Sequence, residues 1–172
     1  MGDDLAARAV GIFRSRLETL AALMARAEQQ WTAQERVLAD LAAARLAPDM
    51  HPLPYQIVFT CNQPREFVAW SKGETYAQPD PESLDWDDLK AHVTTTIESL
   101  AHVGTLPDEK RIEIPPMDAH LLLTAQRYVD EWLLPNFYFH LVTAYGLLRM
   151  SGVELGKADY MAHLIGDLRP NG

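Results

Sequence analysis

Apolar residues recur every three or four positions along residues 4–30, which is the spacing of one face of an α-helix. The charged residues between them fall mostly on the other side. The pattern predicts a long amphipathic helix that buries one stripe against the rest of the protein. The stripe consists of Leu5, Ala9, Phe13, Leu17, Leu20, Met24 and Ala27.

Two more helical segments are predicted before residue 72. Thr32 and Glu35 have the Thr-x-x-Glu spacing of a capping box, so a second helix is expected to begin there and to place apolar residues from 37 to 46 inward. Three prolines between residues 48 and 54 favour a loop and the first turn of a third helix, which begins near Pro52. Pro64 lies inside this third helix, which is expected either to kink or to restart there.

The second half of the chain alternates helical patterns with helix-breaking residues. A helix is expected over residues 86–100, with Ser83 or Asp85 as its cap and Gly104 after its end. Alternating residues near 110–114 predict a short extended piece. A further helix is predicted over residues 117–132, and Pro135 is expected to end it and to start the last long helix, over about residues 136–150.

Helices of this length bury their apolar stripes best when they lie side by side. The sequence therefore predicts an all-α fold: an antiparallel four-helix bundle with short additional helices and at most a minimal extended segment. Residues 1–172 are expected to form a single domain, because this length suits one core. The segment after residue 152 has little periodicity and is expected to pack loosely.

Composition and charge narrow the choice of partners. The chain of 172 residues carries a formal net charge of −9, with 48% hydrophobic and 23% charged residues. Its lysines and arginines are not clustered, which argues against nucleic acid and against anionic membranes as partners. One cysteine, Cys61, cannot form an intramolecular disulfide or a cysteine-rich zinc site. The first ten residues lack the pattern of a signal peptide and no apolar run is long enough to span a membrane, so a reduced, cytoplasmic location is expected.

Standard catalytic and nucleotide-binding motifs are missing, but two segments are unusual. The first is RLAPDMHPLPYQ and the second is LPNFYFHLVTAYGLL. His140 stands among apolar residues of a helix, where an imidazole needs a polar partner or binds a ligand. His51 either satisfies free N–H groups at a helix entry or binds a ligand. The candidate ligand pocket consists of Asp49, His51, Gln56, Asn136, Tyr138, His140 and Tyr145.

The same two segments, with GVELGK after the second, resemble a bacterial family named domain of unknown function nineteen ninety-three. The resemblance extends from the first helix to about Tyr160. It implies the fold of the DinB/YfiT-like metalloenzymes, which are helical bundles. Proteins of this superfamily often hold a divalent metal through three histidines, two of them four residues apart on one helix. Here Ala144 stands four residues after His140, and the helix that contains Gln56 has no histidine.

The resemblance therefore implies an incomplete metal site with two weak candidate ligands, His51 and His140, and a bound divalent metal is not favoured. We expect a domain that binds a small molecule or has a structural role. The alternatives are a metal-dependent hydrolase or thiol transferase that uses His140, or metal-free acid–base chemistry with His140 as the base. A homodimer is also expected, formed through exposed helix faces.

Overall fold

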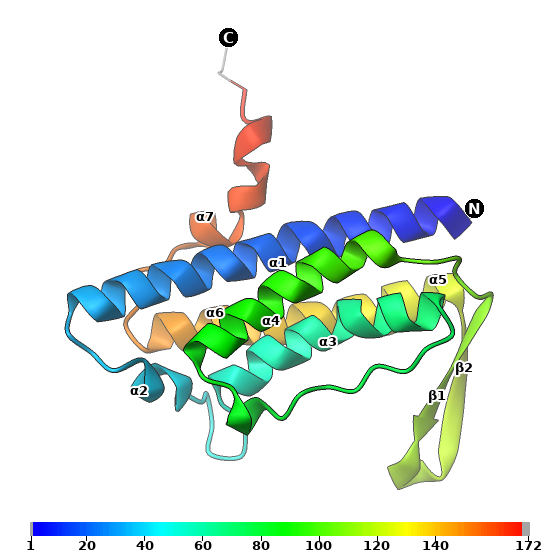
Figure 1. The fold of residues 1–172 in the computed structure, drawn as a ribbon, viewed down its shortest axis with the longest axis horizontal. Helices are drawn as coiled ribbons and strands as arrows, with labels where there is room; N and C mark the ends of the chain where they lie inside the picture. Colours follow the sequence, from blue (N-terminus) through cyan, green and yellow to red (C-terminus); the bar gives the residue numbers. More distant parts are fainter. Residues whose placement is uncertain (1, 170–172) are drawn as a thin grey trace.

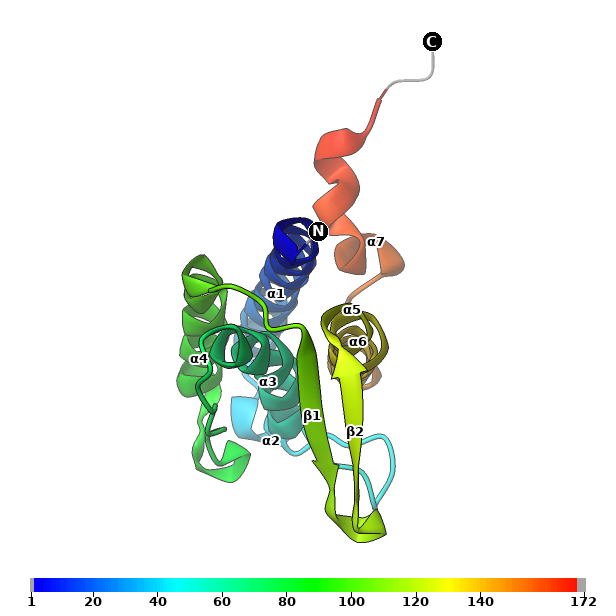
Figure 2. The same cartoon turned by 90° about the vertical axis from the view of Figure 1, so that its right-hand side faces the viewer.

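The computed structural model describes residues 2–169, and four long helices form its main body. They are α1 (Gly2–Ala33), α3 (Leu53–Ser71), α4 (Trp86–Ser99) and α6 (Leu134–Met150). Figures 1 and 2 show the four helices lying side by side, with α3 packed against both α4 and α6, and with α1 packed against α4 and α6. The mostly helical architecture predicted from the sequence is confirmed.

The apolar stripes meet in one core between these helices. Phe13 on α1 is fully buried, and its ring centroid lies 5.8 Å from that of Phe67 on α3 and 5.0 Å from that of Phe137 on α6. Cys61 is also fully buried and has a free thiol. Burial of these large side chains provides the main driving force that holds the helices together.

The link between α1 and α3 differs from the prediction. Helix α1 continues to Ala33, so Thr32 lies in its last turn and does not cap a second helix. Glu35 has a φ of +56° and reverses the chain, while the N–H of Arg36 donates to the carbonyl of Trp31. The expected capping box is therefore wrong. Helix α2 (Leu38–Ala42) is a short piece that follows this turn.

Local capping was predicted correctly at α4. Asp85 accepts a hydrogen bond from the N–H of Asp88, and the Asp88 side chain accepts one from the N–H of Asp85. A short 3-10 turn, η1 (Pro81–Ser83), precedes the helix, and another, η2 (Leu100–His102), extends its end. Helix α4 thus ends before Gly104, the residue expected to follow it.

A β-hairpin replaces the first part of the helix predicted over residues 117–132. Strand β1 (Glu109–Ile114) pairs antiparallel with β2 (Ala119–Thr124), and the 3-10 turn η3 (Pro115–Met117) joins them. Asp118 closes the turn with a φ of +45°. Pro115 and Pro116 favour this turn, and residues 119–124 gain hydrogen bonds from β1 that the periodicity of one segment cannot reveal. The short extended piece predicted near residues 110–114 is confirmed as β1, whereas the helix prediction is wrong for residues 119–124, and the fold is not all-α.

The two internal prolines do not break their helices. Helix α3 runs through Pro64 as one element. The second proline is Pro135, near the start of α6. Helix α5 (Ala125–Arg127) continues through a π-helical turn, η4 (Tyr128–Leu133), directly into α6. The prediction that Pro135 ends a helix is therefore wrong. A π turn carries i→i+5 hydrogen bonds, and this wider turn can relieve the clash between a proline ring and the preceding carbonyl.

Residues 157–169 first lie against α1 and then leave the helical body. Helix α7 (Lys157–Tyr160) packs on α1, and the 3-10 segment η5 (Ala162–Asp167) projects outward, as Figure 1 shows. Leu164, Ile165 and Leu168 are exposed there. In residues 2–169, no helix is both long and apolar enough to cross a membrane.

Candidate functional site

Helices α3 and α6 bring Gln56 and His140 together, although 84 positions separate them in the chain. The Nδ1 atom of His140 lies 2.9 Å from Oε1 of Gln56. Ten residues further along α3, Glu66 contacts Tyr128, which precedes His140, so the two helical segments run antiparallel along this seam. His140 is half-buried and Gln56 is buried, with 3% of its surface exposed.

The hydrogen bonds around Gln56 fix the state of the His140 ring. The Nε2 atom of Gln56 donates to the carbonyl oxygen of His51 at 3.0 Å, so its Oε1 atom faces His140 as an acceptor. Nδ1 of His140 must then carry the proton, which leaves Nε2 with a free lone pair. Burial, and to a lesser extent the charge of His51, lower the pKa of His140 from 6.5 to about 4. The ring is therefore neutral at neutral pH, and Nε2 is a hydrogen-bond acceptor.

Aromatic rings pack against this imidazole and against the neighbouring His51. The ring of His51 stacks on Tyr55 with centroids 4.3 Å apart and an interplanar angle of 10°. Phe59 contacts His51 at 5.6 Å and His140 at 5.1 Å, and the exposed Phe139 also lies 5.1 Å from His140. The sequence reasoning missed Tyr55 and Phe59, although both follow His51 at intervals of four residues, the spacing of neighbours on one helix face.

The other four candidate residues lie outside this cluster. Asn136 lies one turn before His140 on the same face of α6, where its Nδ2 atom donates to the carbonyl of Trp132 at 2.7 Å. Tyr138 is two residues from His140, and residues with this spacing point to nearly opposite sides of a helix. It packs against Phe137, and Tyr145 packs against Tyr160.

Asp49 is exposed, and its side chain forms no hydrogen bond or ion pair with any other residue in the range 2–169. The structure therefore brings His51, Gln56 and His140 together, leaves Asn136 beside them, and separates Asp49, Tyr138 and Tyr145 from the group.

The residues of this cluster do not fit a divalent metal. Nε2 of His140 has a free lone pair, but a catalytic zinc site usually has three protein ligands, and the buried Ala144, one turn further along α6, has no ligand atom. No group of three histidine, cysteine, aspartate or glutamate residues within residues 2–169 is placed to hold a metal ion.

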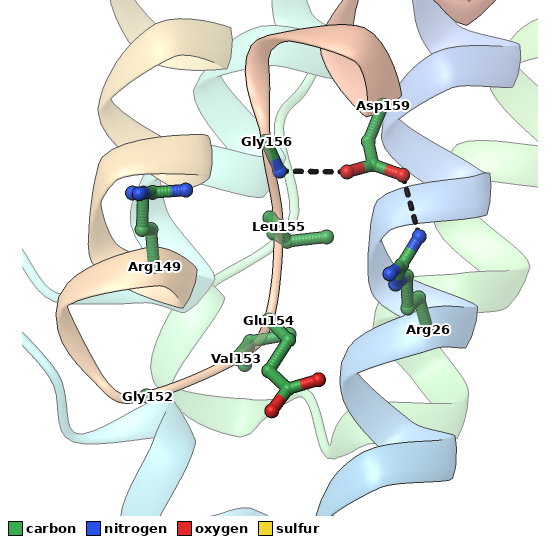
Figure 3. A pocket seen from close by; sticks show the side chains of 8 residues that line it. All are labelled: Arg26, Arg149, Gly152, Val153, Glu154, Leu155, Gly156 and Asp159. Carbon is green, nitrogen blue, oxygen red and sulfur yellow. Dashed lines mark hydrogen bonds and ion pairs between the residues drawn. The ribbon is translucent and has the colours of Figure 1, made fainter.

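The GVELGK segment forms a different site, a pocket of about 470 Å³ between α1 and the end of α6. Figure 3 shows Arg149 and Arg26 on opposite sides of this loop. Asp159 accepts a hydrogen bond from the N–H of Gly156 and forms an ion pair with Arg26, while Gly152 adopts a φ of +95° to end α6. These contacts explain the segment structurally: they tie the end of the chain to α1.

The helical body formed by α1, α3, α4 and α6 is that of a DinB-like protein. In agreement, the chain is similar to the crystal structure of a DinB family member from Shewanella denitrificans, with 28% sequence identity over 88% of both chains and a TM-score of 0.75. The model of the family "Domain of unknown function (DUF1993)" matches residues 5–161, and the chain belongs to this family. A search among curated proteins finds no match.

Proposed function

We propose that this protein binds a small planar molecule at the His140 cluster, which contains His51, Tyr55, Gln56, Phe59 and His140. The observation that carries the proposal is the fixed tautomer of His140. Its Nδ1 atom is bonded to Gln56, and its Nε2 atom is an acceptor among aromatic rings. Ligand sites typically combine aromatic walls with a few polar groups that fix the orientation of the ligand. The complementary ligand is flat and carries one N–H or O–H donor.

The proposal is tested with phenol, indole and adenine as probes. Each is titrated into the full chain, and the imidazole nitrogen resonances are followed by NMR. At least one probe is expected to shift Nε2 of His140, and His140→Ala should abolish its binding. His102→Ala is the matched control, because His102 is exposed at the end of α4. If no probe at millimolar concentration moves the His140 signals, the proposal is wrong.

The metal-dependent hydrolase or thiol transferase remains the alternative, and the donor set argues against it. We expect protein purified without a histidine tag to hold no stoichiometric zinc, nickel, manganese or iron. Near-stoichiometric metal that disappears in His140→Ala would contradict this expectation and favour the enzyme. Elemental analysis of both proteins decides the question.

The homodimer also stays a prediction. It is supported by the outward face of α6, where Phe139, Val142 and Met150 are exposed by 58%, 49% and 55%. Apolar residues along one helix face are a common basis for pairing. We expect sedimentation to show a dimer that Val142→Asp weakens, and a monomer at high concentration would refute it.

The single-domain organisation and the cytoplasmic location stay predictions as well.

A further inference from the structure

A second pocket, of about 340 Å³, lies between the hairpin and the helices, beyond Asn136 from the His140 cluster. Helix α3 provides one wall, η4 and α6 provide another, and β1 covers them. Figure 2 shows the hairpin lying beside the ends of the helices. The volume of the pocket is within the usual range for small-molecule sites. Its lining residues include Gln63, Glu66, Lys110, Tyr128, Trp132 and Asn136.

The helical walls carry a carboxylate whose charge is poorly compensated. Burial raises the pKa of Glu66, and the opposing effects of Lys110 and Tyr128 are smaller. The hydroxyl of Tyr128 donates to Oε2 of Glu66 across 3.5 Å, the limit for a hydrogen bond. No lysine or arginine nitrogen in residues 2–169 lies within ion-pair distance of Glu66. A half-buried carboxylate of this kind is stabilised by a cationic donor.

Further acceptor oxygens come from the same helices. The Oε1 atom of Gln63 is buried and accepts no hydrogen bond from the described part of the chain. The amide nitrogen of Asn136 donates to the carbonyl of Trp132, so the amide oxygen of Asn136 remains as an acceptor. Buried polar atoms without partners are uncommon in native proteins, so the pocket favours a ligand with N–H donors.

The strand on the other side of the pocket supplies a cation. Alternation along β1 places Lys110 and Ile112 toward the helices. Arg111 also lines the pocket, but it is more exposed and forms an ion pair with Glu113. The ammonium group of Lys110 lies 5.6 Å from the centroid of the Tyr128 ring. Opposite charges thus stand on different walls of one pocket, with the aromatic residues Tyr128 and Trp132 between them. Both aromatic residues belong to the π-helical turn, and such turns are frequent at functional sites.

We propose that this pocket binds a small zwitterion of the α-amino acid type, with its ammonium group at Glu66 and its carboxylate at Lys110. Gln63 and Asn136 accept the remaining N–H donors of the ammonium group. Trp132 and Tyr128 contact the apolar part of the ligand. The site shares no residue with the His140 cluster, so either proposal can fail without the other.

Calorimetric titration of the full chain with glycine, leucine and phenylalanine tests this proposal. Phenethylamine and 3-phenylpropionate serve as analogues of phenylalanine that keep only the amine or only the carboxylate. At least one amino acid should bind, and each single-charge analogue of phenylalanine should bind at least tenfold more weakly than phenylalanine. The indole N–H resonance of Trp132 should shift on binding, while that of Trp31, at the other end of the helical body, should not.

Two variants remove one charge each. Glu66→Gln keeps the shape of the side chain, and Lys110→Met keeps most of its length, so both should fold as the parent does by circular dichroism. Each is expected to weaken amino-acid binding about tenfold or more, the usual effect of losing a charge-assisted hydrogen bond. Glu109→Gln, an exposed change on the same strand, should leave binding unchanged.

Three results would overturn the proposal. The first is the absence of heat and of any Trp132 shift with all three amino acids at millimolar concentration. The second is equal binding of phenylalanine and of one single-charge analogue. The third is unchanged affinity in both Glu66→Gln and Lys110→Met.

Discussion

The buried histidine makes the stability of the protein depend on pH. The pKa of His140 is lowered from 6.5 to about 4, first by burial and then by the charge of His51. Between these two values the unfolded chain binds a proton that the folded protein does not bind. The contribution of His140 to the free energy of unfolding is therefore fully present near pH 7. It decreases as the pH drops through 6.5 and no longer changes below about pH 4.

The size of this effect follows from the two pKa values. Between pH 7 and pH 5, a shift of this size corresponds to a loss of about 2 kcal/mol from a fully desolvated ring. His140 is only half-buried, and solvent screens part of the interaction. We therefore expect a loss of about 1 kcal/mol, which lowers the melting temperature of a domain of this size by roughly 2–4 °C.

The assay compares urea unfolding of the parent protein with that of His140→Gln at pH 7 and pH 5. Glutamine does not titrate, so the parent should lose about 1 kcal/mol more than the variant. Burial also lowers the pKa of His92, but His92 is present in both proteins and cancels in the comparison. Equal pH dependence in the two proteins, or an NMR titration of His140 with a midpoint near 6.5, would refute the argument.

Two further predictions concern packing. Phe137→Ala should destabilise the protein by about 3–5 kcal/mol in urea unfolding, because Phe137 is fully buried, while Phe139→Ala, at 58% exposure, should cost much less. Equal losses would contradict the core described above. Gly104→Ala should cost about 1–3 kcal/mol, because its Cβ would lie 2.7 Å from the carbonyl oxygen of Ser71. Gly146→Ala in α6 meets nothing within 4 Å and should instead stabilise the protein by up to about 1 kcal/mol; thermal unfolding distinguishes the two signs.

Local patterns predicted the helices well where their physical cause is local. The stripe with Phe13, Leu17 and Met24 is fully buried, because apolar residues three or four apart share one helix face. The cap of α4 at Asp85 was predicted for the same reason, since its partner is three residues away. By contrast, the capping box predicted at Thr32 was wrong, because α1 continues to Ala33 and Thr32 lies inside it.

Long-range contacts decided the remaining features. Residues 119–124 became a strand because β1 offered hydrogen bonds. The sequence by itself indicated that His140 needs a partner, but only the packing of α3 on α6 selected Gln56 and left Nε2 free.

Long-range contacts also formed the pocket beneath β1. Glu66, Lys110 and Tyr128 lie on three elements, and nothing in their spacing along the chain links them. The sequence determined which faces of the helices are buried, since that depends on neighbours one turn apart. The tertiary structure alone decided which polar groups meet, because those contacts join residues that are far apart in the chain.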